Sequence, residues 1–121
     1  MVKVSTIQKR EKLNEVYAVD ERGNGRAFHK YLIVTDRGLE VPKKILIEFQ
    51  NGPRSVEGSV EGVIDTDLLE IVRHRLKCFQ TGPFATEYNA KALENIELAL
   101  MWMNRRVEDR IERNVLGTNS K

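Results

Sequence analysis

The chain has 121 residues, which is the size of a single domain. Hydrophobic residues make up 40% of it and charged residues 31%, as in a soluble globular protein, and no apolar run approaches the roughly 20 residues of a membrane span. The formal net charge of +2 is too small to indicate long-range attraction to nucleic acid, so we expect neither a membrane nor a nucleic-acid partner.

The beginning of the chain and its cysteine content point to the inside of a cell. Residues 1–15 alternate polar and apolar side chains and lack the unbroken apolar core of a signal peptide, so we expect a cytoplasmic protein. Cys78 is the only cysteine, which excludes an intrachain disulfide. With only two histidines beside it, the sequence predicts no metal site and no cofactor.

The first half of the chain has the pattern of β-structure. The pattern predicts two strands joined by a hairpin turn rich in Gly and Asn, then a strand that alternates at a period of two, and then an irregular or edge strand with Gly and Glu between its valines. In chain order these segments are residues 15–20, 26–35, 44–50 and 54–64. In the third strand Ile45, Ile47 and Phe49 alternate with the residues between them, and one face of this strand is expected to meet the core.

The apolar period changes to that of an α-helix in the second half. A first helix is predicted over 66–79, capped by Asp65 or Thr66, and a second one from near Thr86 to about Val115. Their apolar stripes have spacings of three and four residues: Leu68, Val72, Leu76 and Phe79 in the first helix, and Leu93, Ile96, Leu100, Met103, Val107 and Ile111 in the second.

Together these elements predict an α+β fold, in which an N-terminal antiparallel β-sheet precedes a short-then-long antiparallel helical hairpin. We expect one domain over residues 1–121, with a β-rich part at 1–64, the hairpin at 65–117 and a tail at 118–121.

The second predicted helix is about twice as long as the first, so half of it has no partner within the hairpin. Leu98, Met101 and Trp102 also lie off its apolar stripe and widen its apolar surface. This surplus predicts a homodimer or higher homo-oligomer built on the second helix.

A catalytic reading of the sequence is weak. His74 and Cys78 are four residues apart on one predicted helix face, close enough for a thiolate–imidazole pair. No carboxylate is placed to orient the histidine, and a buried thiol beside a surface histidine accounts for the same spacing. We therefore expect the protein not to be an enzyme.

The connection between the two helices, "FQTGPFATEYN" at residues 79–89, carries more chemistry than a turn requires. Phe79 ends the first helix, and Asn89 lies in the first turn of the second, where free N–H groups favour an anion. An aromatic face beside an amide suits a purine base. The alternative is that Phe79 and Phe84 plug the hairpin end, with Tyr88 beside them, and that Asn89 supports a cap.

The β-rich half followed by this hairpin, with "FQTGPFATEYNAKALENIELALMWMNRRVEDR" across the connection, resembles the phage-encoded Thoeris anti-defence sponge proteins, the Acb2/Tad-type hairpin-domain family. The resemblance implies a protein that binds the cyclic ADP-ribose signal made by bacterial Toll/interleukin-receptor-domain enzymes during infection. Such a protein holds the signal without cleaving it, so that the Thoeris effector is not activated.

The resemblance also implies site residues. Phe79 would stack on the adenine and Asn89 would hydrogen-bond within the pocket. Arg106 and Arg54 would face the pyrophosphate and riboses, and Arg105 is the alternative to Arg106. Asp65 would accept a hydrogen bond from a ribose hydroxyl.

Three points stay open at the level of sequence. A nucleotide-degrading enzyme is the alternative to a binding protein. The linkage isomer of the cyclic ADP-ribose is not fixed by any residue. Related proteins also trap cyclic oligonucleotides of another anti-phage pathway, CBASS immunity, and the sequence leaves such partners open.

Overall fold

The computed structural model describes residues 1–35, 40–114 and 116, and we use these throughout. The chain divides into two compact units. We call Met1–Gly52 with Glu57–Val63 the sheet unit, and Pro53–Val56 with Ile64–Lys121 the helix unit. A four-stranded antiparallel sheet is followed by a shorter and then a longer helix, which confirms the predicted α+β fold. No helix among the described residues is long and apolar enough to cross a membrane.

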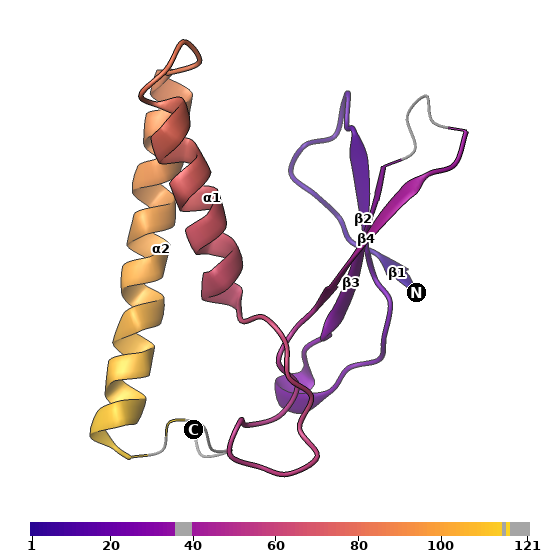
Figure 1. Cartoon of the computed structure of the whole chain (residues 1–121), viewed down its shortest axis with the longest axis vertical. Coiled ribbons are helices and arrows are strands. Elements are labelled where there is room, and N and C mark those ends of the chain that lie inside the picture. Colours follow the sequence, from indigo (N-terminus) through magenta and orange to yellow (C-terminus); the bar gives the residue numbers. More distant parts are fainter. Residues whose placement is uncertain (36–39, 115, 117–121) are drawn as a thin grey trace. The chain divides into compact units, whose positions relative to one another are not determined.

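The sheet has its strands in chain order, each antiparallel to the next (Figure 1). Its core is thin: Ala18 is the one fully buried apolar side chain in the described part of the chain. Tyr31 and Phe49 pack edge to face, with ring centroids 5.6 Å apart. The strands are β1 (Val2–Lys3), β2 (Asn14–Ala18), β3 (Lys30–Thr35) and β4 (Lys43–Glu48).

The predicted hairpin between the second and third strands is confirmed, but its connection is longer than expected. Gly25 and Arg26 adopt left-handed backbone angles, with φ of 68° and 67°, inside a short 3-10 turn (Asn24–Arg26). These angles interrupt an extended strand, so β3 begins at Lys30 and not at Arg26. Strand β1 was not predicted, because two residues are too few to form a pattern.

The expected irregular or edge strand at 54–64 was wrong. Only two isolated bridges form in this region, Phe49 with Val63 and Asn51 with Val60. Gly58 has a φ of 88°, and Gly62 lies so close to β4 that a Cβ atom there would be 2.5 Å from the carbonyl oxygen of Glu48. The glycines therefore serve a tight turn and a close approach and do not continue a ladder.

Two helices follow, α1 (Asp65–Phe79) and α2 (Glu87–Glu112), as predicted. The cap of α1 differs from the expectation of Asp65 or Thr66: the Asp67 carboxylate accepts from the backbone N–H of Ile64 at 3.0 Å.

The cap of α2 is the expected one, because the Thr86 hydroxyl oxygen accepts from the backbone N–H of Asn89 at 3.0 Å. The helix ends at Glu112, where Asn114 turns left-handed with a φ of 56°. The predicted end near Val115 and the tail at 118–121 lie outside the described residues.

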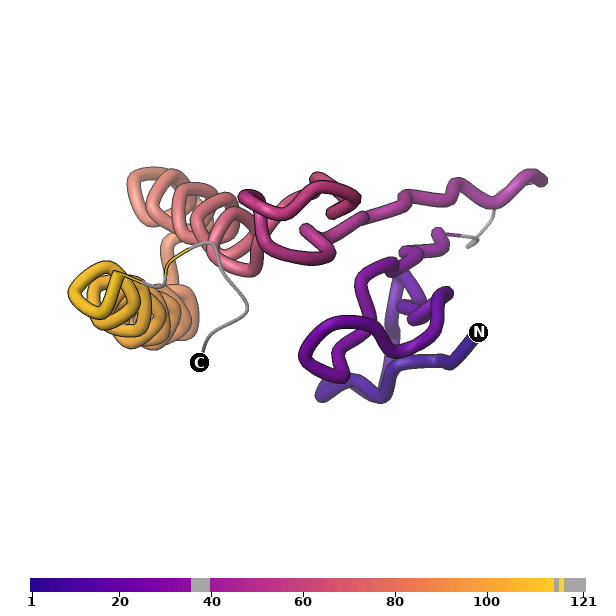
Figure 2. The backbone as a smooth tube through the Cα atoms, turned by 90° about the horizontal axis from the view of Figure 1, so that it is seen from below, coloured from indigo at the N-terminus to yellow at the C-terminus, as the bar shows by residue number. Residues whose placement is uncertain are grey.

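The helices run side by side in the helix unit, as Figures 1 and 2 show. Their facing residues alternate at spacings of three and four, which is the seam of an antiparallel coiled-coil-like pair. The seam positions are Thr66, Leu69, Arg73 and Leu76 on α1 with Gln80 at its C-cap, and Asn89, Leu93, Ile96, Leu100, Met103, Val107 and Arg110 on α2. Leu68 of the predicted stripe on α1 and Glu97 on α2 are half-buried as well.

The predicted stripe of α2 is thus confirmed from Leu93 to Val107, but its last member was wrong. Ile111 is half exposed and Arg110 is buried in its place, because the seam advances by three residues after Val107 and not by four. On α1, Val72 and Phe79 lie at the surface, and the charged Arg73 takes a seam position.

Candidate functional site

The hairpin end, residues 79–89, is a loop tied down from both helices. The Gln80 side chain bridges to Thr86 twice: its amide nitrogen donates to the Thr86 carbonyl at 3.1 Å, and its amide oxygen accepts from the Thr86 N–H at 3.1 Å. The Thr81 hydroxyl donates to the carbonyl of Cys78 at 2.7 Å. Side chains therefore bind several backbone groups at and between the two helix termini, which fixes the shape of this loop.

Phe79 presents its ring at this end. The side chain is 39% exposed, and the guanidinium carbon of Arg75, one helical turn earlier, lies 5.5 Å from the ring centroid. This cation–π contact occupies one side of the phenyl ring and holds it in place. Phe84 and Tyr88 do not plug the hairpin end as expected, because they are 71% and 85% exposed.

Asn89 holds the loop with the donors of its side chain and backbone. Its amide nitrogen donates to the carbonyl of Phe84 at 3.1 Å, and its backbone N–H forms the Thr86 cap. The side-chain oxygen of Asn89 has no hydrogen-bond partner among the described residues, so an acceptor remains available beside the exposed ring. The residue thus has the structural role considered from sequence and keeps a recognition group as well.

Asp65, Arg105 and Arg106 lie toward the other end of the helices. The Arg73 guanidinium donates to Glu97 at 2.7 Å and thereby sets the register of the pair. On that register Asp65 comes level with Arg105, and the rest of α2 extends beyond α1. All three side chains are exposed.

Arg54 is exposed and belongs to the segment Pro53–Val56 of the same helix unit. On α2, Asp109 pairs with Arg113 at 3.1 Å, and no partner of Arg105 is found in the described part of the chain.

The predicted site residues therefore form two groups within one chain. Fourteen residues of α1 separate Asp65 from Phe79, and seventeen residues of α2 separate Asn89 from Arg106. At 1.5 Å per residue these separations are about 21 Å and about 26 Å. One chain does not bring all of these residues around a single small molecule.

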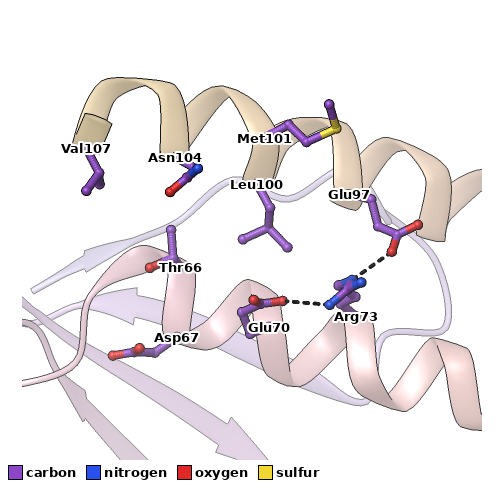
Figure 3. A pocket seen from close by; sticks show the side chains of 9 residues that line it. All are labelled: Thr66, Asp67, Glu70, Arg73, Glu97, Leu100, Met101, Asn104 and Val107. Atoms are coloured by element: carbon purple, nitrogen blue, oxygen red, sulfur yellow. Dashed lines mark hydrogen bonds and ion pairs between the residues drawn. The ribbon is translucent and has the colours of Figure 1, made fainter. Parts of the chain in front are cut away.

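A groove between α1 and α2 was not foreseen from the sequence (Figure 3). It has a volume of about 710 Å³ and is lined by Thr66, Asp67, Glu70, Arg73, Glu97, Leu100, Met101, Asn104 and Val107. Arg73 donates to Glu97 and lies 3.5 Å from Glu70, and the hydrogen bond to Glu97 raises the pKa of the Arg73 guanidinium. Three carboxylates against one arginine make this groove unsuitable for a pyrophosphate. The sequence feature that could have indicated this groove is Arg73, a charged residue at a seam position of an otherwise apolar pattern.

The His74–Cys78 pair lies on the exposed surface of α1, with the sulfur 3.9 Å from Nε2. The thiol is exposed and not buried as the structural alternative assumed. No group of three or more His, Cys, Asp or Glu residues among those described is arranged to hold a metal ion.

Comparison with known proteins places this hairpin in a family. Residues 42–108 match the family described as Acb2/Tad1, hairpin domain. A curated relative, Thoeris anti-defense 1 of Bacillus phage SBSphiJ7, is 40% identical over 79 residues, which are 65% of this chain and 55% of that protein. The chain thus spans about half the length of the relative that it matches. Because the family match covers more than half of the chain, including β4, α1 and most of α2, the chain belongs to the Acb2/Tad1 hairpin-domain family.

Proposed function

We propose that this chain is a phage anti-defence protein that acts against the Thoeris system in the cytoplasm of the infected host. It binds a cyclic ADP-ribose isomer and holds it without cleavage, so that the signal does not reach its effector. Family membership and the name of the phage relative support the anti-Thoeris part of this proposal. The observation that supports binding of this ligand is that the exposed Phe79 ring and the available acceptor oxygen of Asn89 lie at the same hairpin end.

Each proposed contact has a chemical reason. The adenine stacks on the side of Phe79 that Arg75 leaves open, and Asn89 hydrogen-bonds to the edge of the base. Arginine forks clamp the pyrophosphate, because their planar donors match two phosphate oxygens at once. The arginines assigned to this role are Arg54 and Arg106, with Arg105 adjacent, while Asp65 accepts from a ribose hydroxyl.

Two copies are required to complete such a site. About 26 Å separates Asn89 from Arg106 on α2, so Arg106 comes from the partner helix in an antiparallel, two-fold arrangement. If Asn89 lies level with the partner's Arg106, the two-fold axis crosses α2 midway between these two positions, beside Leu98. Leu98, Met101 and Trp102 are exposed at that position and supply the apolar contact that such an axis needs.

Sequestration without chemistry also agrees with the energy available. A ligand of about 35 heavy atoms at about −0.3 kcal/mol per atom reaches roughly −10 kcal/mol, near the nanomolar range. Stacking on one aromatic ring and two arginine clamps account for a large part of that value. A protein that titrates a signal needs this affinity and no stabilisation of a transition state.

Calorimetry with cyclic ADP-ribose isomers tests the proposal. We expect one isomer to bind tightly, and the Phe79→Ala and Asn89→Ala variants to lose most of that affinity. Tyr88→Ala is the matched control, because this aromatic is at the same hairpin end and is given no ligand contact. If no isomer binds the unmodified chain, the proposal is wrong.

Recovery of the ligand separates sequestration from degradation. After incubation, the protein is denatured by heat and the released compound is identified by mass spectrometry. Intact cyclic ADP-ribose supports a sponge, whereas linear ADP-ribose would establish the nucleotide-degrading enzyme instead. Cyclic oligonucleotides are added in the same assay, and their binding by the Asn89→Ala variant would place them at a separate site.

A further inference from the structure

The loop between β1 and β2, residues 5–13, concentrates positive charge. Between Lys3 and Lys12 the chain has four basic residues, Lys3, Lys9, Arg10 and Lys12, and one acidic residue, Glu11. This excess of three positive charges exceeds the net charge of +2 of the whole chain. The rest of the chain is therefore slightly negative, and the loop together with Lys3 is one of its basic segments.

Hydrogen bonds within the loop hold it in one shape. The backbone N–H of Val4 donates to the carbonyl of Val16 at 2.8 Å and closes the base of the loop. The Thr6 hydroxyl donates to the carbonyl of Gln8 at 2.9 Å, and the Gln8 side chain donates to the carbonyl of Arg10 at 3.0 Å. A loop closed at its base and tied by its own side chains is organised before a ligand arrives.

The loop lines an open, shallow cavity with donors on its wall. Its volume is about 370 Å³, and its lining consists of Lys3, Val4, Ser5, Thr6, Gln8, Lys9 and Lys12. The Lys9 ammonium donates to the Ser5 hydroxyl at 3.1 Å, which brings a charge and a hydroxyl together. Ammonium and hydroxyl groups at one cavity suit the oxygens of a phosphate.

Counter-charges inside the protein neutralise only part of this cluster. Lys3 pairs with Glu15 at 3.2 Å. The hydrogen bond that the Tyr17 hydroxyl donates lowers the pKa of the Glu15 carboxyl, and the hydrogen bond and charge of Lys3 lower it further. Lys9 and Lys12 form no ion pair with a carboxylate in the described part of the chain, but the charge of Lys12 also acts on the Glu15 carboxyl, and Lys12 is half-buried. Two lysine charges at the cavity thus have no direct ion pair among the described residues.

We propose that this loop is an anion site that binds a phosphate group of a small phosphorylated compound. The site belongs to the sheet unit and is made of residues other than those of the proposed cyclic ADP-ribose site. It does not depend on that function, since neither lysine is part of the hairpin.

Pyrophosphate is the probe, and amide chemical shifts of the full chain are the readout. At constant ionic strength, pyrophosphate should shift the amides of the loop saturably. The double variant Lys9→Gln/Lys12→Gln should bind about tenfold more weakly, since two charge contacts are lost. Lys43→Gln/Lys44→Gln removes the same charge from β4, two strands across the sheet from β2, and should leave the affinity unchanged.

Three outcomes overturn the site. Sodium chloride of equal ionic strength could shift the same amides equally, which would indicate screening only. The Lys9/Lys12 double variant could bind as tightly as the unmodified chain. A single-stranded oligonucleotide could bind the loop while pyrophosphate does not, which would exclude a small-phosphate site. Calorimetry of the same variant with cyclic ADP-ribose keeps the two proposals distinguishable, because that affinity should not change.

Discussion

At the scale of single residues, Asp20 is the carboxylate on which the β2–β3 connection depends. It accepts from the backbone N–H of His29 at 3.1 Å, where the buried His29 closes the connection before β3. Burial opposes ionisation of Asp20, but the backbone N–H groups of His29, Lys30 and Asp20 itself outweigh it. The pKa of Asp20 therefore lies below its usual value of 3.8.

This lowered pKa predicts a pH-dependent contribution to stability. Because the folded state lowers the pKa, the contribution is present above about pH 4 and is lost as the pH falls through the folded-state value. Asp20→Asn should lower the melting temperature at pH 7, and the difference from the unmodified chain should narrow below about pH 4. Thermal unfolding followed by circular dichroism from pH 7 to pH 3 measures it. A difference that stays constant with pH would contradict this role of the carboxylate.

Site residues could be predicted only as far as their position along the chain. Phe79 and Asn89 were expected at the hairpin end and lie there, because helix ends follow from local pattern. Their contacts with Arg75 and Phe84 were not predicted, since side-chain partners depend on rotamers and on the path of the loop.

At the scale of elements, the helices were predictable and the segment after β4 was not. Apolar residues at a period near 3.6 determine a helix over many turns, so small errors in the cap or in the last seam position leave the element intact. The segment 54–64 had alternating valines, but Gly58 and Gly62 serve a left-handed turn and a close backbone approach. The role of a glycine depends on the backbone around it in the fold, and the alternation of valines in the sequence does not show that environment.

The cap of α2 allows a test at this scale. Thr86→Ala removes the hydroxyl that accepts from the N–H of Asn89, and we expect a loss of about 1 kcal/mol in the free energy of unfolding. Thr86→Ser keeps the oxygen and should retain most of that stability. Urea unfolding monitored by circular dichroism compares them. Equal stability of the two variants would show that the hydroxyl contributes nothing.

Two leucines of α2 form a matched pair for its two faces. Leu100 is half-buried in the seam and Leu98 is half exposed on the outer face. Leu100→Ala should lower the free energy of unfolding by about 1–2 kcal/mol, because it opens the packing against α1. Leu98→Ala should change it by less than about 0.5 kcal/mol in dilute solution but weaken self-association. Urea unfolding and sedimentation equilibrium separate these effects, and a similar loss of stability in both variants would refute the assignment of faces.

At the scale of the whole molecule, the spacing of the proposed ligand residues is the main constraint. Asn89 and Arg106 are on one rigid helix, so bending within a chain cannot bring them together over about 26 Å. In an antiparallel pair of α2 helices each site would take Asn89 from one copy and Arg106 from the other. Two equivalent sites per dimer then follow from the two-fold symmetry.

Mixing two inactive variants tests this arrangement. Asn89→Ala and Arg106→Ala homodimers each have a defect in both sites and should bind cyclic ADP-ribose weakly. In a mixed dimer both defects fall in one site and the other is intact. After unfolding and refolding an equal mixture, half of the dimers are mixed, so about one quarter of the wild-type binding capacity should return. Calorimetry gives this capacity directly as stoichiometry. A site contained in a single chain would recover nothing on mixing, because every chain in the mixture has one of the two defects.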